Sequence, residues 1–263
     1  MTRGTGGVAF ADSLPDPVVA AGGLLTQLGD MWFLLLAIAA LYWRARGGRA
    51  PSLTATPLRD CLLLLALAVG SYAAVAALKS VFALPRPPGA GTAALPAWLP
   101  PAVAPVYESL VTADGYGFPS GHATAATAVY GGAAVLLRAG TPRLRYAAAG
   151  TVVALVAFSR LLIGVHYPVD VAAGSLLGLA VLALLLALVR RFGSPVCSRG
   201  SPGSARAGTR SPAPALAGAA LLALVALALA PGLEPLLGLL GVAAGLGLWL
   251  RPGSSGGSSL RGP

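Results

Sequence analysis

Residues 146–189 read YAAAGTVVALVAFSRLLIGVHYPVDVAAGSLLGLAVLALLLALV. Two apolar runs, 146–163 and 168–189, are joined by a short segment that carries His166, and each run is about long enough to cross a bilayer as a helix. Arg160 and Asp170 are the charged residues that interrupt them. Backbone polar groups inside lipid must be satisfied within the segment itself, so such runs form helices. This part of the chain therefore predicts an all-α membrane protein.

The composition of the whole chain favours the same class. Hydrophobic residues make up 56% of the 263 residues and charged residues only 10%, whereas a soluble domain has about 25% charged residues. The net charge of +10 would suit a nucleic-acid partner, but the arginines lie between apolar runs and not along one polar face. We therefore expect no nucleic-acid binding and interpret the arginines as topology signals. Cys61 and Cys197 have neither a disulfide framework nor metal-ligand spacing.

The apolar runs recur along the chain and predict a polytopic bundle of about seven transmembrane helices. The predicted spans are 24–43, 61–78, 121–137, 146–163, 168–189, 214–230 and 236–250. We expect three regions in the chain. They are a catalytic membrane core of five spans at 1–192, a flexible Gly/Ser/Pro/Arg-rich cytoplasmic linker at 193–213, and a C-terminal helical pair with its tail at 214–263.

The placement of arginine predicts the orientation of these spans. Arginines gather after the first, third, fifth and seventh spans, which the positive-inside rule assigns to the cytoplasm. The N-terminus is then outside and the C-terminus cytoplasmic. Of the 18 lysines and arginines, those on the outer side are Arg3, Lys79, Arg86 and Arg160. The last three belong to polar motifs, so we expect a site on the extracytoplasmic face of the cell membrane.

The first polar motif is Lys79, the single lysine of the chain, followed after six residues by Arg86 and Pro87. Taken alone, this motif is a weak signal, because a lysine near a helix end usually extends its ammonium group to the lipid headgroups. The outer loop that follows, 85–118, is long and rich in proline. Its amphipathic aromatics Trp98 and Tyr107 predict a lid or substrate guide that lies at headgroup level.

The second motif is Pro119-Ser120-Gly121-His122, at the start of the third predicted span. Ser120 suits the N-cap position, and the free backbone N–H groups that follow favour an anion at this helix end. Gly121 lets a phosphate approach the backbone closely, and His122 in the first turn can donate a proton to a leaving oxygen. The alternative is an ordinary capped helix with an interfacial histidine.

The third motif is Ser159-Arg160, followed by His166 and Asp170. Pro168 marks the first turn of the fifth span, so Asp170 lies within reach of the imidazole four residues earlier. A carboxylate there fixes the tautomer of the ring and stabilises the positive charge that develops when the other nitrogen attacks. The alternative is a surface Arg–Asp pair with a bystander histidine, but ionisable residues at membrane spans are usually functional.

Together the motifs supply a nucleophile, a proton donor and three cations, which can cleave a phosphate ester without a metal. The pattern K-x6-RP, PSGH, SR-x5-H-x3-D resembles the three-part signature of the type 2 phosphatidic acid phosphatase (PAP2) superfamily. Every specified position matches: Lys79, Arg86, Pro87, Pro119, Ser120, Gly121, His122, Ser159, Arg160, His166 and Asp170. Many members of that family have six spans with the first motif after the third, whereas here it follows the second.

The resemblance implies a helical membrane phosphatase that forms a phosphohistidine intermediate and uses no metal or other cofactor. It assigns His166 as the nucleophile, Asp170 as its partner and His122 as the general acid. It also implies that the phosphate is held by Lys79, Arg86, Ser120, Gly121 and Arg160.

Three functions fit these observations. The leading one is hydrolysis of a lipid phosphate or lipid (polyprenyl) diphosphate at the outer leaflet, with polyprenyl diphosphates, phosphatidate and phosphatidylglycerol phosphate as candidates. A non-catalytic lipid-headgroup carrier or scramblase is the second, although binding alone needs cations and not His122, His166 and Asp170. The third is a phosphatase for a soluble extracytoplasmic phosphoester. The expected partners are an amphiphilic phosphate and the lipid bilayer, and nothing in the sequence indicates an oligomeric state.

Two smaller features complete the predictions. Asp30, which lies with Gln27 in the outer part of the first span, is expected to be an interfacial carboxylate facing water; the alternative is a polar network near the site. Gly174 and Gly178 in the fifth span allow close helix approach, and we expect this approach to occur within the chain.

Overall fold

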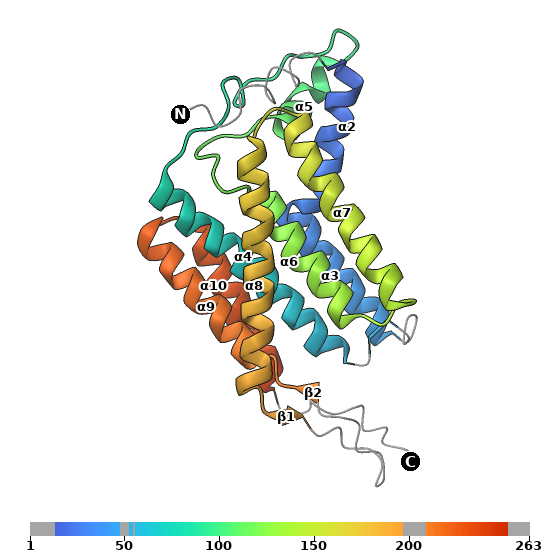
Figure 1. Ribbon diagram of the computed structural model, residues 1–263, viewed down its shortest axis with the longest axis vertical. Coiled ribbons are helices and arrows are strands. Elements are labelled where there is room, and N and C mark those ends of the chain that lie inside the picture. Colours follow the sequence, from blue (N-terminus) through green and yellow to red (C-terminus); the bar gives the residue numbers. More distant parts are fainter. Residues whose placement is uncertain (1–13, 48–52, 55, 197–208, 252–263) are drawn as a thin grey trace.

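The computed structural model describes residues 14–47, 53–54, 56–196 and 209–251. The predicted all-α bundle is confirmed, since the long helices lie side by side in an elongated body (Figure 1). α2, α5 and the outer loop lie at one end of this body (Figure 1). The other end carries a short antiparallel pair, β1 (Pro195–Val196) and β2 (Thr209–Arg210). Most of the predicted linker, 197–208 with Cys197, and Arg3 lie outside the described residues.

Each predicted span falls on helical structure. The helices are α2 (Asp16–Thr26), α3 (Met31–Arg46), α4 (Pro57–Phe82), α5 (Ala104–Val111), α6 (Gly121–Leu136), α7 (Pro142–Leu162), α8 (Pro168–Phe192), α9 (Ala213–Leu229) and α10 (Leu233–Leu250), with the 3-10 turns η1 (Gln27–Gly29) and η2 (Pro101–Val103). Helices α4, α7, α8 and α10 are each long and apolar enough to cross a membrane, and the α2–α3 pair makes a fifth span if it is counted as one. α6 and α9 are shorter, so the total of seven spans stays a prediction, as does their orientation.

The outer helices α7 and α8 turn apolar side chains away from the bundle. Phe158 on α7 and Leu176, Leu179 and Leu184 on α8 are exposed. Large apolar side chains exposed in this number would be unfavourable in water and suit contact with lipid. The exposed faces therefore agree with the membrane assignment made from composition.

The first predicted span, 24–43, differs from a continuous helix. α2 ends at Thr26, η1 follows, and α3 starts at Met31 after a bend of 54°. Asp30 has an extended backbone, and its carboxylate accepts a hydrogen bond of 2.7 Å from the N–H of Met31. Asp is among the preferred N-cap residues, so the chain begins a new helix here although its apolar content continues through the break.

The central helix of the bundle is α4, which contacts α3, α6, α8, α9 and α10. Its Leu63 and Leu67 are fully buried in the main hydrophobic core, together with Leu216 of α9. Small residues line the rest of that contact: Ala223 of α9 packs with Ala73 of α4. Small side chains let two helices approach closely, which favours association in lipid. The C-terminal pair thus packs on α4, while the predicted division into core, linker and pair stays a prediction.

Helix α8 lies close against α6 at two glycines, and this approach positions the site. A Cβ atom on Gly174 would lie 2.5 Å from the carbonyl oxygen of Ser120, and one on Gly178 would lie 2.5 Å from that of Thr124. Both distances exclude any larger residue without a backbone shift. The predicted contact of this glycine pair within the chain is confirmed, and it holds the first turns of α6 and α8 together.

Candidate functional site

The three sequence motifs meet at one cavity of about 300 Å³ near the end of the bundle that carries α2 and α5. The motif residues that line it come from five different segments and are Lys79, Arg86, Gly121, His122, Arg160 and His166. Asp170 lies behind His166, and Ser120 precedes Gly121 at the start of α6. The fold thus brings together the residues that the sequence selected, while their individual roles remain proposals.

His166 lies between an arginine and a carboxylate. Its Nε2 is 3.1 Å from a guanidinium nitrogen of Arg86, and its Nδ1 is 3.6 Å from a carboxylate oxygen of Asp170. Arginine can only donate hydrogen bonds, which assigns the Nε2 lone pair as acceptor and places the ring proton on Nδ1, facing Asp170. Nε2 is therefore the nitrogen with a lone pair on the cavity side.

The charge state of His166 follows from its surroundings. The side chain is 2% exposed, and this burial lowers its pKa. The contact with Asp170 opposes that shift, whereas the nearby cations Arg160 and Arg86 add to it. Burial and like charge both disfavour the imidazolium form, so the ring is neutral near pH 7. A neutral imidazole is the form that can act as a nucleophile.

Asp170 is fixed by the first turn of α8. Its side chain is fully buried, and one carboxylate oxygen accepts a hydrogen bond of 3.0 Å from the N–H of Tyr167. Its carbonyl oxygen accepts a further hydrogen bond of 3.0 Å from the N–H of Ser120. These bonds hold the carboxylate behind His166 and join the two helix starts that carry the second and third motifs.

Ser120 occupies the predicted N-cap position of α6, but its hydroxyl does not act as a cap. Its backbone is extended, and its Oγ is buried without a hydrogen-bond partner among the described residues. An unpaired buried hydroxyl costs about 1–3 kcal/mol, so a ligand oxygen that accepts from it would recover that energy. The structure therefore places Ser120 at the N-cap position but corrects the expectation of a side-chain cap, and the anion site at this helix end stays a prediction.

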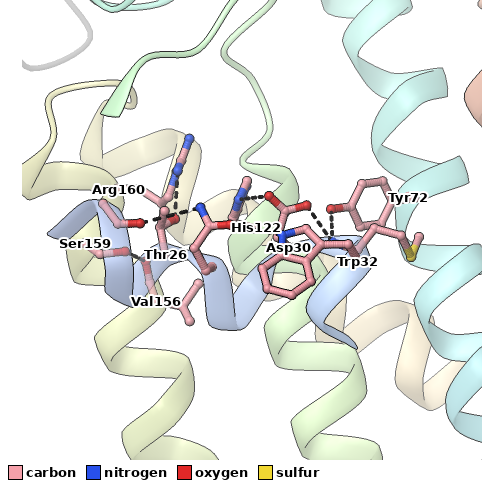
Figure 2. Close-up of polar contacts among 11 residues, drawn as sticks. Thr26, Asp30, Trp32, Tyr72, His122, Val156, Ser159 and Arg160 are labelled. Carbon is pink, nitrogen blue, oxygen red and sulfur yellow. Dashed lines mark hydrogen bonds and ion pairs between the residues drawn. The ribbon is translucent and has the colours of Figure 1, made fainter. Parts of the chain in front are cut away.

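Arg160 is a buried cation held by a residue outside the three motifs. The side chain of Thr26, at the end of α2, accepts a hydrogen bond of 2.7 Å from the guanidinium of Arg160 (Figure 2). The Nε of Arg160 has no hydrogen-bond partner among the described residues. Ser159 is turned away from the cavity, since its hydroxyl donates to the carbonyl of Val156 at 2.8 Å. Arg160 therefore keeps donors for an anion, whereas Ser159 has a local structural contact.

Lys79 lines the cavity from the last turn of α4. The alternative was that the lysine extends its ammonium group toward the lipid headgroups. In the structure Lys79 lines the cavity instead. The helix ends just beyond it at Phe82, with Ala83 as the C-cap in the left-handed conformation. The position of Lys79 opposite Arg160 and Arg86 gives the cavity three cations from three segments.

The predicted outer loop, 85–118, folds over the cavity. It contains η2 and α5, and its residues Ser109, Leu110 and Asp114 line the cavity wall. Trp98 is 57% exposed, in agreement with a position at the headgroups. Tyr107, however, is buried in a small apolar cluster with Ile163 and Val165, which corrects the expectation that it faces the lipid interface. That cluster fastens the loop to the segment that carries His166.

Polar residues from outside the three motifs also line the cavity, and of these Gln27 and Asp30 were named from sequence, with a polar network near the site as the alternative. Thr26, Gln27 and Asp30 reach the cavity from the break between α2 and α3, and Glu234 reaches it from the first turn of α10. Asp30 was expected to face water, but one of its carboxylate oxygens lies 3.6 Å from Nε2 of His122. The signal for this in the sequence was an aspartate, a preferred N-cap residue, inside an apolar run. Glu234 gave no comparable signal beyond being a carboxylate at the start of an apolar segment.

Comparisons with known proteins give this arrangement a context. Residues 60–194, about half of the chain, match the family model of the PAP2 superfamily. A segment of 96 residues is 38% identical to phosphatidylglycerophosphatase B of Bacillus subtilis (strain 168) and covers 34% of this chain and 45% of that protein. The aligned segment thus spans less than half the length of that relative. The match to the family model begins at α4 and leaves out α2, α3, α9 and α10.

A solved structure shows the same fold. It is the crystal structure of a transmembrane PAP2-type phosphatidylglycerolphosphate phosphatase from Bacillus subtilis, with a TM-score of 0.54 and 23% sequence identity. The superposition covers 71% of this chain and 85% of that chain. The likeness therefore extends beyond the segment matched by the family model.

Proposed function

The chain belongs to the PAP2 superfamily, and we propose that it is a metal-independent membrane phosphatase that hydrolyses a lipid phosphate or lipid diphosphate at the outer leaflet. The observation that carries this proposal is the setting of His166, whose Nδ1 faces buried Asp170 while its Nε2 faces a cavity with three cations. A site that only binds headgroups needs the cations but not an oriented, neutral imidazole. The His166–Asp170 pair therefore favours catalysis over binding alone.

The first step is transfer of the phosphoryl group to His166. Lys79, Arg86 and Arg160 neutralise the phosphoryl oxygens, and Ser120 with the N–H groups at the start of α6 adds hydrogen bonds. Nε2 of His166 attacks phosphorus, and the bond to the lipid oxygen breaks with its electron pair going to that oxygen. His122, in its protonated form, gives the leaving oxygen its proton. Asp170 stabilises the positive charge that the ring of His166 acquires.

The second step releases phosphate. A water molecule attacks the phosphorus of the phosphohistidine, and the P–N bond breaks with its electron pair returning to Nε2 of His166. The neutral His122 takes the proton that the water loses and is ready for the next cycle. The products are inorganic phosphate and the lipid that has lost one phosphoryl group, which is the free alcohol from a monoester and the lipid monophosphate from a diphosphate.

Arg86 must move during this cycle. In the structure one of its guanidinium nitrogens lies against Nε2 of His166, and it also donates to the carbonyl of Val165 at 3.1 Å. Its Nε donates to the carbonyl of Asp114 at 2.9 Å. Before Nε2 of His166 can attack phosphorus, the guanidinium nitrogen that contacts it must bind a phosphoryl oxygen instead. The hydrogen bond from Nε of Arg86 to Asp114 can persist.

The substrate class follows from where the cavity lies. A site enclosed by membrane helices and covered by the outer loop suits an amphiphile whose phosphate is at the interface. Because the curated relative and the solved structure are both described as phosphatidylglycerophosphate phosphatases, phosphatidylglycerol phosphate is the first substrate to test. Phosphatidate and polyprenyl diphosphates are the next candidates. The arginine distribution supports the outer leaflet as the place of reaction.

The test is phosphate release by the purified protein in detergent from a panel of these lipids and of soluble phosphoesters. We expect turnover of at least one lipid that persists in EDTA and is inhibited by vanadate. Turnover of soluble esters alone would favour an extracytoplasmic phosphatase of another class. Binding of lipid phosphates without any release would favour the carrier or scramblase.

A further inference from the structure

The break between α2 and α3 brings polar groups to the cavity from a part of the chain that the family model does not cover. Two of these groups contact motif residues directly. Thr26 accepts from Arg160, and Asp30 lies against His122 (Figure 2). The break thus contacts both an anion-binding cation and the residue assigned as general acid.

The break is held in place from three sides. The hydroxyl of Tyr130 on α6 donates to the carbonyl of Leu28 at 2.7 Å, and the N–H of Met31 donates to the hydroxyl of Tyr72 on α4 at 2.9 Å. A Cβ atom on Gly29 would lie 2.7 Å from a methyl carbon of Val156 on α7 and 3.2 Å from the carbonyl oxygen of His122. Glycine is therefore needed for this close approach. Asp30 is fixed relative to His122 by packing.

The two oxygens of the Asp30 carboxylate have different neighbours. Oδ1 accepts the cap hydrogen bond from Met31, and Oδ2 is 3.6 Å from Nε2 of His122. Figure 2 shows Asp30 between His122 and Tyr72. Both members of the pair are partly exposed, with the histidine side chain 21% and the carboxylate 34% accessible. A carboxylate at this separation interacts with an imidazolium by charge.

The other charged or titratable groups that line the cavity with His122 are Lys79 and Tyr72 of α4, Arg86 and Asp114 of the outer loop, Arg160 of α7, His166, and Glu234 of α10. Lys79 lines the cavity from α4 and Arg160 from α7, and like charge disfavours a further positive charge on the imidazole. From α8, no residue lines the cavity within the described part of the chain, and Asp170 lies behind His166. Among the described residues, Asp30 is the carboxylate with an ion-pair contact to His122, and this contact favours the protonated ring.

We propose that Asp30 is a positioning residue that orients His122 and raises the proton affinity of its ring, so that His122 can deliver a proton to the leaving oxygen. The inference rests on the proposed function, because it assigns Asp30 to the acid of that reaction. The competing role is that of a helix cap alone. A cap stabilises α3 but has no reason to alter the pH dependence of turnover.

The variant that separates these roles is Asp30→Asn. Asparagine is as good an N-cap as aspartate and has nearly the same size, so α3 should keep its cap while the charge is lost. We expect kcat on a lipid phosphate to fall about 10- to 100-fold, with KM little changed. The basic limb of the pH profile should move about one unit or more toward lower pH, since a neighbouring carboxylate no longer supports the proton. Asp16→Asn, an exposed carboxylate at the start of α2, is the matched control.

The choice of leaving group provides the second measurement. 4-Nitrophenolate leaves without being protonated, so the loss in Asp30→Asn should shrink to less than about 3-fold with 4-nitrophenyl phosphate. In a His122→Gln background, Asp30→Asn should cause little further loss, because the two residues act through one proton. Equal losses with both substrates, or an unchanged pH profile with lower thermal stability, would overturn the proposal and leave Asp30 as a cap.

A third readout does not depend on turnover. The chain has two histidines, so their ring nitrogens can be assigned by NMR with His122→Gln as reference. In Asp30→Asn the His122 ring should lose its proton at lower pH than in the wild type, while His166 should change little. An unchanged His122 titration would refute the pairing, whereas a wild type that releases no phosphate from any substrate would refute the proposed function.

Discussion

The two histidines of the cavity are paired with carboxylates in contrasting ways. His166 and Asp170 are four residues apart, both side chains are buried, and both lie in the segment that matches the family model. His122 and Asp30 come from distant parts of the chain, are partly exposed, and meet because a span is broken outside that segment. One pair is built by a single helix start, and the other requires that α3, α4, α6 and α7 pack correctly around a bend.

This difference has a consequence for how each pair responds to change. The buried pair depends on the first turn of α8, where the N–H of Tyr167 donates to the carboxylate of Asp170, so it should tolerate changes at the break between α2 and α3. The partly exposed pair depends on the position of η1, so packing changes at the break should affect it selectively. The following predictions test that contrast.

The largest effect is expected for His166→Ala. Removal of the attacking nitrogen removes the covalent step, so turnover should be abolished and no acid-labile phosphoenzyme should form. The measurement is trapping of labelled phosphate on the quenched protein. In contrast, His122→Gln should still form the phosphoenzyme from 4-nitrophenyl phosphate. Labelled phosphoenzyme in His166→Ala would disprove the assignment of the nucleophile.

Asp170→Asn should have the next largest effect. The amide keeps the size of the carboxylate but loses the charge that stabilises the imidazolium-like ring during attack, so we expect kcat to fall roughly 10²–10³-fold with KM little changed. In a serine-protease triad the same change costs about 10⁴-fold, which sets the upper bound. Arg160→Ala should instead weaken inhibition by vanadate. A raised KM with intact kcat in Asp170→Asn would reduce Asp170 to a cap of α8.

A change at the break should act on the other pair. In Gly29→Ala the added methyl would meet Val156 and the backbone of His122, so η1 must move away from α6. Overpacking of this kind costs about 1–3 kcal/mol, and we expect about a 10-fold loss of kcat on lipid phosphates. The loss should be smaller with 4-nitrophenyl phosphate. The variant shifts His122, the proposed general acid, and this leaving group does not need a proton from it.

The matched control for that variant is Gly150→Ala on α7, where a Cβ atom would have no neighbour within 4 Å. It should leave kinetics unchanged. If Gly29→Ala also retained full activity with both substrates, the break would not position His122, and the contrast between the two pairs would lose its basis.

The smallest effect is expected for Thr26→Val, which keeps the shape of the side chain but removes the acceptor of the Arg160 hydrogen bond. A hydrogen bond to a charged group contributes about 1.5–3 kcal/mol, but Arg160 can turn its donors to the substrate phosphate, so we expect KM to change only about 3- to 10-fold. Thr151→Val, at an exposed position of α7, is the control. A kcat effect with unchanged KM would place Thr26 in the chemical step instead.

The contrast also explains what could be predicted from sequence. Asp170 was assigned to His166 because four residues along a helix start bring two side chains together. The positions of Lys79, Arg86 and Arg160 around one cavity followed from their placement at the outer ends of spans. Asp30 could not be assigned to His122 in the same way, because that contact depends on a bend whose direction is set by Tyr72, Tyr130 and Gly29.

Two other differences have the same physical origin. Tyr107 was expected at the lipid interface from its amphipathic ring, but the loop folds back and buries it against Ile163 and Val165. Glu234 reaches the cavity because α10 packs along α4, a tertiary contact that composition does not reveal. Spacing along the sequence determines which side chains meet at the start of one helix. The positions of the outer loop and of the C-terminal helical pair depend on packing between distant segments.

In the proposed reaction, with His166 as the nucleophile, the contact between Arg86 and His166 imposes an order of events. While the guanidinium hydrogen-bonds to Nε2, the lone pair of the nucleophile is occupied and cannot react with a passing electrophile. A phosphate that enters the cavity competes with Nε2 of His166 for the same guanidinium. When the guanidinium binds the phosphate, the lone pair of Nε2 is free. The substrate thus uncovers the group that will attack it. Because Arg86 is also bonded to the carbonyl of Asp114, the outer loop and the nucleophile share one arginine, and recognition of the phosphate is coupled to the position of that loop.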